Sequence, residues 1–240
     1  EIALCNPRVR WILSGDICGQ FNCPQQHWHG APVTDKQIER SAFLRDLAPV
    51  LVELTKCRRS DPFLFSVYTR APLPPLGELR RMFPFRGLAR WNLTVSHRAR
   101  RVLIERANRP CRQREHVFVP KDERYPNSQD LYLSVGEPLV ACKTARGLIN
   151  AGLYEVESLE PLVVKGEGES IEIPLTAFHA CLRSSHAMVT IVAQGRTLPG
   201  TVCLWETRSA FFSEKHLRVG LSRATDASLV SIGPSLKWKP

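Results

Sequence analysis

Residues 193–226 read AQGRTLPGTVCLWETRSAFFSEKHLRVGLSRATD, and this stretch decides the fold class. A polar turn containing Gly195 precedes the apolar run Val202 to Trp205, which has the length and composition of a buried strand. Glu214 to Ser222 has the spacing of a helix, and Leu229 to Ile232 is a further short apolar run. A strand, a helix and a second strand in this order predict two parallel strands of an α/β sheet.

The same alternation occurs twice more toward the amino terminus. Trp91 to Val95 predicts a strand, and Ala99 to Asn108 has apolar residues at helical spacing. Val9 to Leu13 predicts an earlier buried strand, and Thr34 with Gln37 forms a capping-box pattern for a helix through about Leu47. Leu51 to Leu54 indicates another strand. We therefore expect an α/β fold with a parallel-rich sheet.

A β-rich segment interrupts this alternation. Short runs such as YEVESL and SIEIPL lie between Leu148 and about Ala180, separated by glycine and charged turns. They predict a small inserted β-barrel at 148–182. Leu131 to Cys142 indicates extended chain. The proline-rich and glycine-rich residues 71–87 and the polar residues 109–130 indicate connecting loops.

Composition narrows the classes of partner. The chain has 240 residues, of which 43% are hydrophobic, and a formal net charge of +10. Such a basic excess favours polyanions through counterion release. The apolar stretch from Leu47 to Leu54 is far too short to span a bilayer, so we expect no membrane partner. Eight irregularly spaced cysteines without secretory features favour reduced thiols inside the cell.

Several polar residues have chemistry suited to a nucleotide. Asp16 and Gln20 follow the first predicted strand and could orient water or sense a phosphate. Arg58 and Arg223 could contact a γ-phosphate, and the Gln194–Thr197 turn could meet a phosphate backbone. Each feature taken alone also fits an ordinary loop or a surface ion pair. A metal site is not expected, although a zinc cluster of Cys18, Cys23, His27 and His29 is a minor alternative.

Taken in order, these segments resemble the later motifs of superfamily 1 DNA helicases of the PIF type. EIAL (1–4) resembles the end of Walker B, and WILSGDICGQF (11–21) resembles the strand with GD and Gln that follows it. CRRSDPFLF (57–65) resembles the FRQSD-type segment, and VGEPLVACKTARGLINAG (135–152) resembles VGMPVMLTRN through LVNG. AQGRTL and VGLSRAT resemble the SQGLTL segment and the YVALSRVTS helix.

The resemblance implies RecA-like domains and roles for individual residues. Residues 1–55 would be the tail of a first RecA-like domain, and 56–147 with 183–240 a second one, with an SH3-like barrel at 148–182. The residues implied in catalysis are Glu1, Gln20, Arg58 and Arg223. Those implied in ATP binding are Gly15, Asp16 and Gly195, and those implied in nucleic-acid binding are Ser96, His97, Asn150, Gln194 and Thr197.

The function implied is that of the carboxy-terminal motor portion of an ATP-dependent helicase moving 5′ to 3′ on single-stranded DNA, with ATP and Mg²⁺ as cofactors. DNA repair and recombination are the implied processes. The compartment is intracellular, with nucleus, mitochondrion and virus all open, and no obligate protein partner can be inferred. The chain opens with Glu1 and contains no GxxxxGK[ST] loop, so we expect that loop upstream and no ATP hydrolysis by the chain alone.

Two departures from the family pattern keep alternatives open. Three residues separate Asp16 from Gln20, where the family has two, and Ile191 and Val192 replace a polar pair such as HK. A degenerate relative that binds single strands without hydrolysing ATP is one alternative. A viral-type superfamily 1 RNA helicase, which shares the QG and SR segments, is another.

Overall fold

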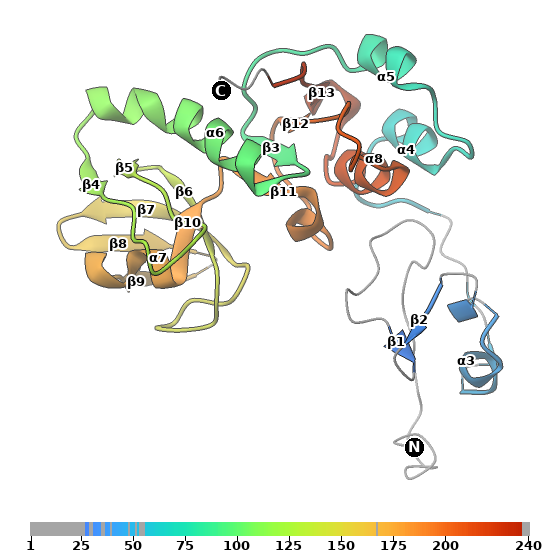
Figure 1. Cartoon of the computed structure of the whole chain (residues 1–240), viewed down its shortest axis with the longest axis horizontal. Helices are drawn as coiled ribbons and strands as arrows, with labels where there is room; N and C mark the ends of the chain where they lie inside the picture. Colours follow the sequence, from blue (N-terminus) through green and yellow to red (C-terminus); the bar gives the residue numbers. More distant parts are fainter. Residues whose placement is uncertain are drawn as a thin grey trace.

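The chain folds into a mixed α/β structure built on a parallel sheet (Figure 1). The computed structural model describes residues 56–166 and 168–236 and, before them, the short stretches 27–28, 31–34, 37–38, 40–47, 49–50 and 52. The parallel sheet has the order β11-β3-β12-β13. Its strands are β3 (Trp91–Thr94), β11 (Ala187–Val189), β12 (Val202–Leu204) and β13 (Val230–Ile232). The parallel sheet predicted from the sequence is confirmed.

Apolar side chains on the two sides of this sheet belong to two cores. Alternate strand residues such as Leu93 and Leu204 pack with α4 (Pro62–Thr69), α5 (Leu76–Met82) and α8 (Glu214–Leu221). Ala187 and Cys203 belong instead to the core that contains Leu103 and Ile104 of α6 (His97–Asn108). β3 and β12 are buried along their whole length, as expected of strands covered on both faces. The polar residues of β3, Asn92 and Thr94, make hydrogen bonds there.

The second sheet is antiparallel and lies beside α6. Its order is β10-β6-β7-β8-β9, with β10 and β9 at its edges. The strands are β6 (Pro138–Ala141), β7 (Leu153–Leu159), β8 (Leu162–Lys165), β9 (Ser170–Glu172) and β10 (Leu182–Ser184). The sheet thus includes β6, which precedes the segment 148–182, and most of β10, which follows it. The SH3-like character of this module and the domain boundaries remain predictions.

Two segments expected to be loops contain regular structure. The connector 71–87 forms α5, which begins after Pro75 and buries Leu79. Proline is well tolerated at a helix start, so the prolines of this segment do not exclude a helix after Pro75. The polar segment 109–130 contains η1 (Arg109–Gln113) and β4 (Val117–Val119), and β4 pairs with β5 (Leu131–Leu133). A three-residue strand is too short for periodicity to detect.

The helix expected from Thr34 to Leu47 is not continuous. The capping box is present, since Thr34 Oγ1 accepts from the Gln37 amide at 3.3 Å and Gln37 Oε1 accepts from the Thr34 amide at 2.8 Å. Residues 40–41 are not helical, and α3 (Ala42–Leu47) begins after Ser41, a residue type that favours helix starts. Strands β1 (His27–Trp28) and β2 (Ala31–Pro32) form a small hairpin. The strand expected at 9–13 lies outside the described residues, and of the strand expected at 51–54 only Val52 is described, outside any strand.

The remaining elements are short. They are η2 (Leu175–Ala177), α7 (Phe178–Cys181), η3 (Thr190–Ala193) and η4 (Ala227–Leu229). None of the helices that the structure describes has the length and apolarity needed to cross a membrane.

Candidate functional site

The carboxyl ends of the parallel strands β3 and β11 lead into three of the predicted site residues that the structure describes. β3 leads into Ser96 and His97, and β11 leads through η3 into Gln194. The polar residue Glu206 follows β12 after Trp205. β11 and β12 lie on opposite sides of β3, so the chain reverses its direction of strand addition there. In open α/β sheets this is the edge where ligands bind.

The Gln194–Thr197 turn contacts the end of α8 through Arg223. The Arg223 guanidinium is buried and donates from Nη1 to the carbonyl of Arg196 at 3.2 Å. It also donates from Nε to Val219 O at 3.0 Å and from Nη2 to Ser222 Oγ at 2.7 Å. The Leu198 amide donates to the Arg223 carbonyl at 2.9 Å. The two predicted motifs are therefore joined by side-chain and backbone hydrogen bonds.

A third predicted motif meets the same place. Arg59 donates from Nε to Thr197 Oγ1 at 3.0 Å and from Nη1 to the Ser222 carbonyl at 3.2 Å. Asp61 caps α4 by accepting from the Leu64 amide at 3.0 Å, and its other oxygen accepts from the Ala227 amide at 2.7 Å. We call Arg59, Thr197, Ser222 and Arg223 the arginine joint. It gathers residues more than 100 positions apart in the sequence at one exposed edge.

Gly195 supplies the backbone conformation of this turn. Its φ is +81°, and a Cβ built there would meet nothing within 4 Å. The requirement for glycine is therefore conformational, because left-handed backbone is costly for other residues. Arg58, its neighbour Arg59, Gly195 and Thr197 are all exposed, so the joint has an open side toward solvent.

Cys57 lies at the start of the same segment. Its Sγ lies 3.2 Å from Ser60 Oγ and 3.4 Å from the Tyr68 hydroxyl, and it accepts from the Ser60 amide at 3.4 Å. Burial raises the pKa of the thiol, but the hydrogen bonds to Ser60 and Tyr68 together lower that pKa to about 7. Thiolate is thus a substantial form of Cys57 at neutral pH.

The start of α6 is held by Glu206. Ser96 caps the helix by accepting from the Ala99 amide at 3.1 Å. Glu206 accepts from the amides of Val95 and Ser96 at 2.9 Å and 2.8 Å, and from Ser96 Oγ at 2.8 Å. A carboxylate there is favoured by the helix dipole. His97 follows on the exposed surface, where burial, Arg100, Arg183 and Arg101 lower its pKa.

Asn150 lies on the loop after β6. Its backbone N–H donates to Thr144 Oγ1 at 3.1 Å, and the residue is exposed. The neighbouring Ile149 is 68% exposed, which leaves an apolar side chain on a basic surface loop.

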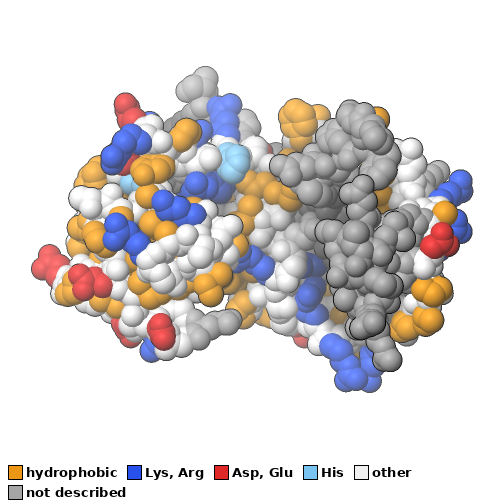
Figure 2. All heavy atoms as spheres, turned by 90° about the horizontal axis from the view of Figure 1, so that it is seen from below, with side chains coloured by type: hydrophobic (Ala, Val, Ile, Leu, Met, Phe, Trp, Pro, Cys, Tyr) orange, Lys and Arg blue, Asp and Glu red, His pale blue; other side chains and the backbone are white. Residues whose placement is uncertain are grey.

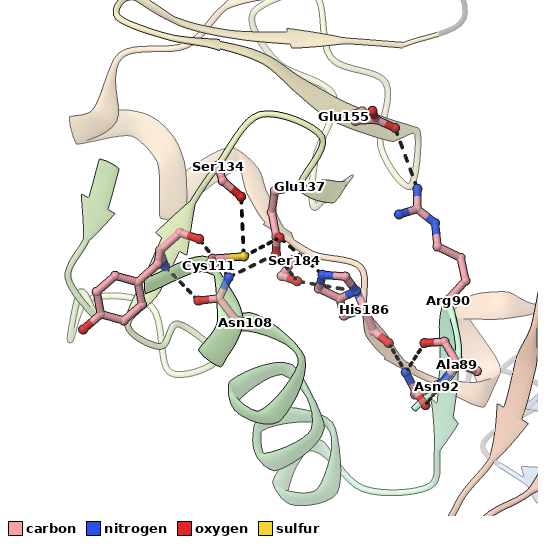
Figure 3. A network of polar contacts seen from close by, with 11 residues as sticks. Ala89, Arg90, Asn92, Asn108, Cys111, Ser134, Glu137, Glu155, Ser184 and His186 are labelled. Atoms are coloured by element: carbon pink, nitrogen blue, oxygen red, sulfur yellow. Dashed lines mark hydrogen bonds and ion pairs between the residues drawn. The ribbon is translucent and has the colours of Figure 1, made fainter. Parts of the chain in front are cut away.

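A separate polar network is buried between α6 and the antiparallel sheet (Figure 3). Glu137 is 3% exposed and accepts from Asn108 Nδ2 at 3.2 Å, from Ser184 Oγ at 3.3 Å and from Cys111 Sγ at 3.5 Å. His186 Nε2 lies 3.3 Å from the same carboxylate. Asn108, at the end of α6, also bonds both backbone groups of Tyr132. We call this the Glu137 network, and it fixes β5 and β6 to α6.

Several predicted residues lie outside the described part of the chain. They are Glu1, Gly15, Asp16 and Gln20, so their roles remain predictions. The zinc alternative also lies largely there, since Cys18, Cys23 and His29 are not described. Among the residues that are described, no group of three potential metal ligands occurs.

Three structural features escaped the analysis of the sequence. Arg59 makes the contacts to Thr197, whereas Arg58 is exposed beside it. Glu206 directly follows the β12 run, the same strand-then-carboxylate signal that singled out Asp16. Glu137 lies next to Gly136 and carries no local signal for burial, because its partners come from two distant segments.

The fold and the arginine joint define a class of protein: an α/β domain of the RecA-like type with an antiparallel module beside it. A scan against models of protein families found no match, and a search of curated proteins found none. Solved structures with a similar fold include Pif1 helicases. The Pif1 helicase of Candida albicans has 14% sequence identity and a TM-score of 0.53, covering 72% of this chain and 53% of that one.

Two Bacteroides structures are also similar. Pif1 bound to ssDNA has 18% identity and a TM-score of 0.53, covering 86% of this chain and 60% of that one. Pif1 in complex with ADP-AlF3 and ssDNA has 20% identity and a TM-score of 0.52, with the same coverage of 86% and 60%. This chain thus spans between half and two thirds of the length of these helicases. The RecA-like fold expected from the resemblance is confirmed.

Proposed function

We propose that the chain is the carboxy-terminal motor portion of an ATP-dependent DNA helicase that moves 5′ to 3′ on single-stranded DNA. The observation that carries this proposal is the arginine joint, in which Arg59, the Gln194–Thr197 turn and Arg223 meet between the end of α8 and the segment that leads into β12. Similar structures in complex with ADP-AlF3 and ssDNA support it. ATP and Mg²⁺ would be the cofactors of the complete motor.

The joint would supply the far wall of an ATP cleft. An arginine that faces the γ-phosphate stabilises the charge that develops as the phosphoryl group leaves. Arg58 is exposed and can take this role directly. Arg223 would exchange its bond to the Arg196 carbonyl for one to phosphate when the cleft closes. Gln194, Gly195 and Thr197 would transmit that exchange to the bound strand, because their turn carries the carbonyl that Arg223 releases.

The strand would pass over the carboxyl ends of the sheet and the exposed loop of the antiparallel module. Ser96, His97 and Asn150 lie on those segments. Binding there would be sensitive to salt, since contacts to phosphate release counterions.

The experiment is single-stranded DNA-stimulated ATP hydrolysis by a chain extended upstream through a GxxxxGK[ST] loop, together with the variant Arg223→Ala. We expect stimulation in the parent and none in the variant. Arg223→Lys, which keeps the charge, and a thermal melt of each protein separate lost chemistry from lost folding. Full activity of Arg223→Ala would remove Arg223 from the mechanism.

A second candidate, a relative that binds single strands without turning over ATP, is favoured by Ile191 and Val192. Both side chains are 43% exposed at η3, where the family has polar donors. Such a protein would bind an oligonucleotide with the expected salt dependence and release no phosphate from ATP.

A further inference from the structure

The side of α6 that faces β10 carries several arginines without acidic partners. Arg100 is 5% exposed, and its Nη2 donates to the Asn127 carbonyl at 3.0 Å. Its Nε is buried and makes no hydrogen bond. Within the part of the chain that the structure describes, neither Arg100 nor Arg101 nor Arg183 forms a salt bridge. We call Arg100, Arg101, Arg183 and His97 the α6–β10 cluster.

The charges of this cluster act on one another. Burial, together with the charges of Arg183 and Arg101, lowers the pKa of Arg100 to about 10, and the charge of Cys142 opposes that shift. An arginine keeps its proton even so, which means that the site holds uncompensated positive charge. A buried charge without a partner costs several kcal/mol in typical proteins.

The space beside Arg100 is too small for an anion. The cavity lined by Arg100, Gln129, His179 and Arg183 measures about 10 Å³, which is room for about one water molecule. A water there could join Arg100 Nε to Gln129 Oε1, which is also buried without a partner. Water leaves the charge uncompensated, however. The field of Arg100 therefore acts at the surface, where Arg183 is half-buried and Arg101 and His97 are exposed.

The half of the molecule that contains the antiparallel sheet carries many basic side chains. In Figure 2, which views the molecule from below, Lys and Arg side chains are spread over that half and acidic side chains lie toward its rim. His97 lies three residues after the carboxyl end of β3. Cys142, whose charge interacts with Arg183 and Arg100, begins the loop that contains Asn150. The cluster thus lies between two segments already proposed to contact nucleic acid.

We propose that the α6–β10 cluster binds the phosphodiester backbone of a single strand, with Arg183 and Arg101 contacting phosphate and Arg100 raising the local potential from beneath. The proposal rests on the proposed function in that the ligand is a nucleic-acid strand. It adds a phosphate-binding site formed by residues of α6 and β10. Contacts to phosphate position a strand without reading its sequence. Affinity at this site should therefore be the same for strands of different base composition.

The test is the affinity of this chain for a fluorescent dT oligonucleotide, measured by anisotropy over a range of salt concentrations. For Arg183→Gln we expect about a tenfold loss of affinity at low salt. The slope of log K against log salt should fall by about 0.7, the value for one phosphate contact of a single strand. The matched control is Arg106→Gln, which removes an exposed arginine from the last turn of the same helix and should change neither quantity.

The variant Arg100→Met tests whether the buried arginine of the cluster contributes to affinity. It keeps the length of the side chain and removes the uncompensated charge, so the free protein should melt no lower than the parent while its affinity falls. A lower melting temperature with unchanged affinity would mean that Arg100 is structural, and the proposal would be wrong. Unchanged affinity and salt slope in Arg183→Gln would overturn it as well.

Two further results separate this proposal from the proposed function. If Asn150→Ala and Thr197→Ala lose affinity while Arg183→Gln and Arg101→Gln do not, the strand binds elsewhere and only the cluster is excluded. If the parent chain binds no oligonucleotide, both proposals fail. Competition by inorganic phosphate at the concentration of oligonucleotide phosphates would show a site for the free anion instead, and would also overturn the backbone assignment.

Discussion

The arginine joint and the Glu137 network are both built from polar side chains of distant segments, yet they differ in burial. In the joint, Arg59 and Thr197 are exposed, and one side is open to solvent. In the Glu137 network the carboxylate is enclosed and has four side-chain partners. An enclosed network with every member bonded fixes a structure, whereas an open one can exchange a partner for a ligand. Exposure to solvent thus distinguishes the arginine joint, which can bind a ligand, from the Glu137 network, which stabilises the fold.

The largest effect we expect concerns the open joint. In the upstream-extended chain, Arg58→Ala should lower the rate of ATP hydrolysis by about a thousandfold or more, the range for an arginine that faces a γ-phosphate. Steady-state phosphate release with saturating single-stranded DNA measures it. Arg59→Ala is the matched neighbour, and we expect a much smaller effect because its guanidinium is already bonded to Thr197 and Ser222.

A reversal of these two results would sharpen the comparison in another way. It would place the phosphate contact at Arg59 and shift the resemblance to the family by one residue. Equal, small effects would remove the whole segment from the cleft.

The second effect concerns the enclosed network. Glu137→Ala should lower the free energy of unfolding by about 3–5 kcal/mol, because it leaves the half-buried His186 and the buried Asn108 amide without their shared acceptor. Urea denaturation followed by tryptophan fluorescence measures it. The control is Glu155→Ala on β7, whose carboxylate faces Arg90 (Figure 3). The two groups are 3.8 Å apart, and the Glu155 side chain is 58% exposed. We expect the control to change stability by less than about 1 kcal/mol. Similar losses in the two variants would mean that enclosure does not distinguish these networks.

The segments of the arginine joint could be predicted from the sequence and the Glu137 network could not, for a physical reason. The strands β3, β12 and β13 and the helices α6 and α8 were predicted because each has a local periodicity. The segments of the joint were predicted because their order resembles a known family. The Glu137 network could not be predicted, since Glu137, Asn108 and His186 meet only through tertiary packing. The helix α5 was missed because prolines before its first turn resemble a loop.

The third effect concerns the backbone of the joint. Gly195→Ala should destabilise the chain by about 1 kcal/mol, because alanine is strained at a φ of +81° although nothing obstructs its Cβ. The same substitution at Gly77 in α5 also meets nothing within 4 Å and has no left-handed φ. There alanine should be neutral or stabilising by up to about 1 kcal/mol. Thermal melts of the two variants measure the difference, and equal shifts would mean that conformation does not explain the glycine of this turn.

The smallest effect concerns the thiol of Cys57, which lies two residues before Arg59 of the arginine joint. The folded-state pKa of Cys57 is about 7, below the ordinary value of 9.0. Its thiolate fraction is therefore nearly complete above pH 8 and is lost as the pH falls through 7. Alkylation by iodoacetamide should rise less than about twofold between pH 7 and pH 8, where an ordinary thiol rises about ninefold. Mass spectrometry of the labelled peptide gives this ratio, and Cys203, which is buried with a pKa raised to about 11 by burial, is the internal control. Ser60→Ala removes one bond to the sulfur and should move the Cys57 profile toward the ordinary one; a profile that does not move would mean that the Ser60 bond does not hold the thiolate.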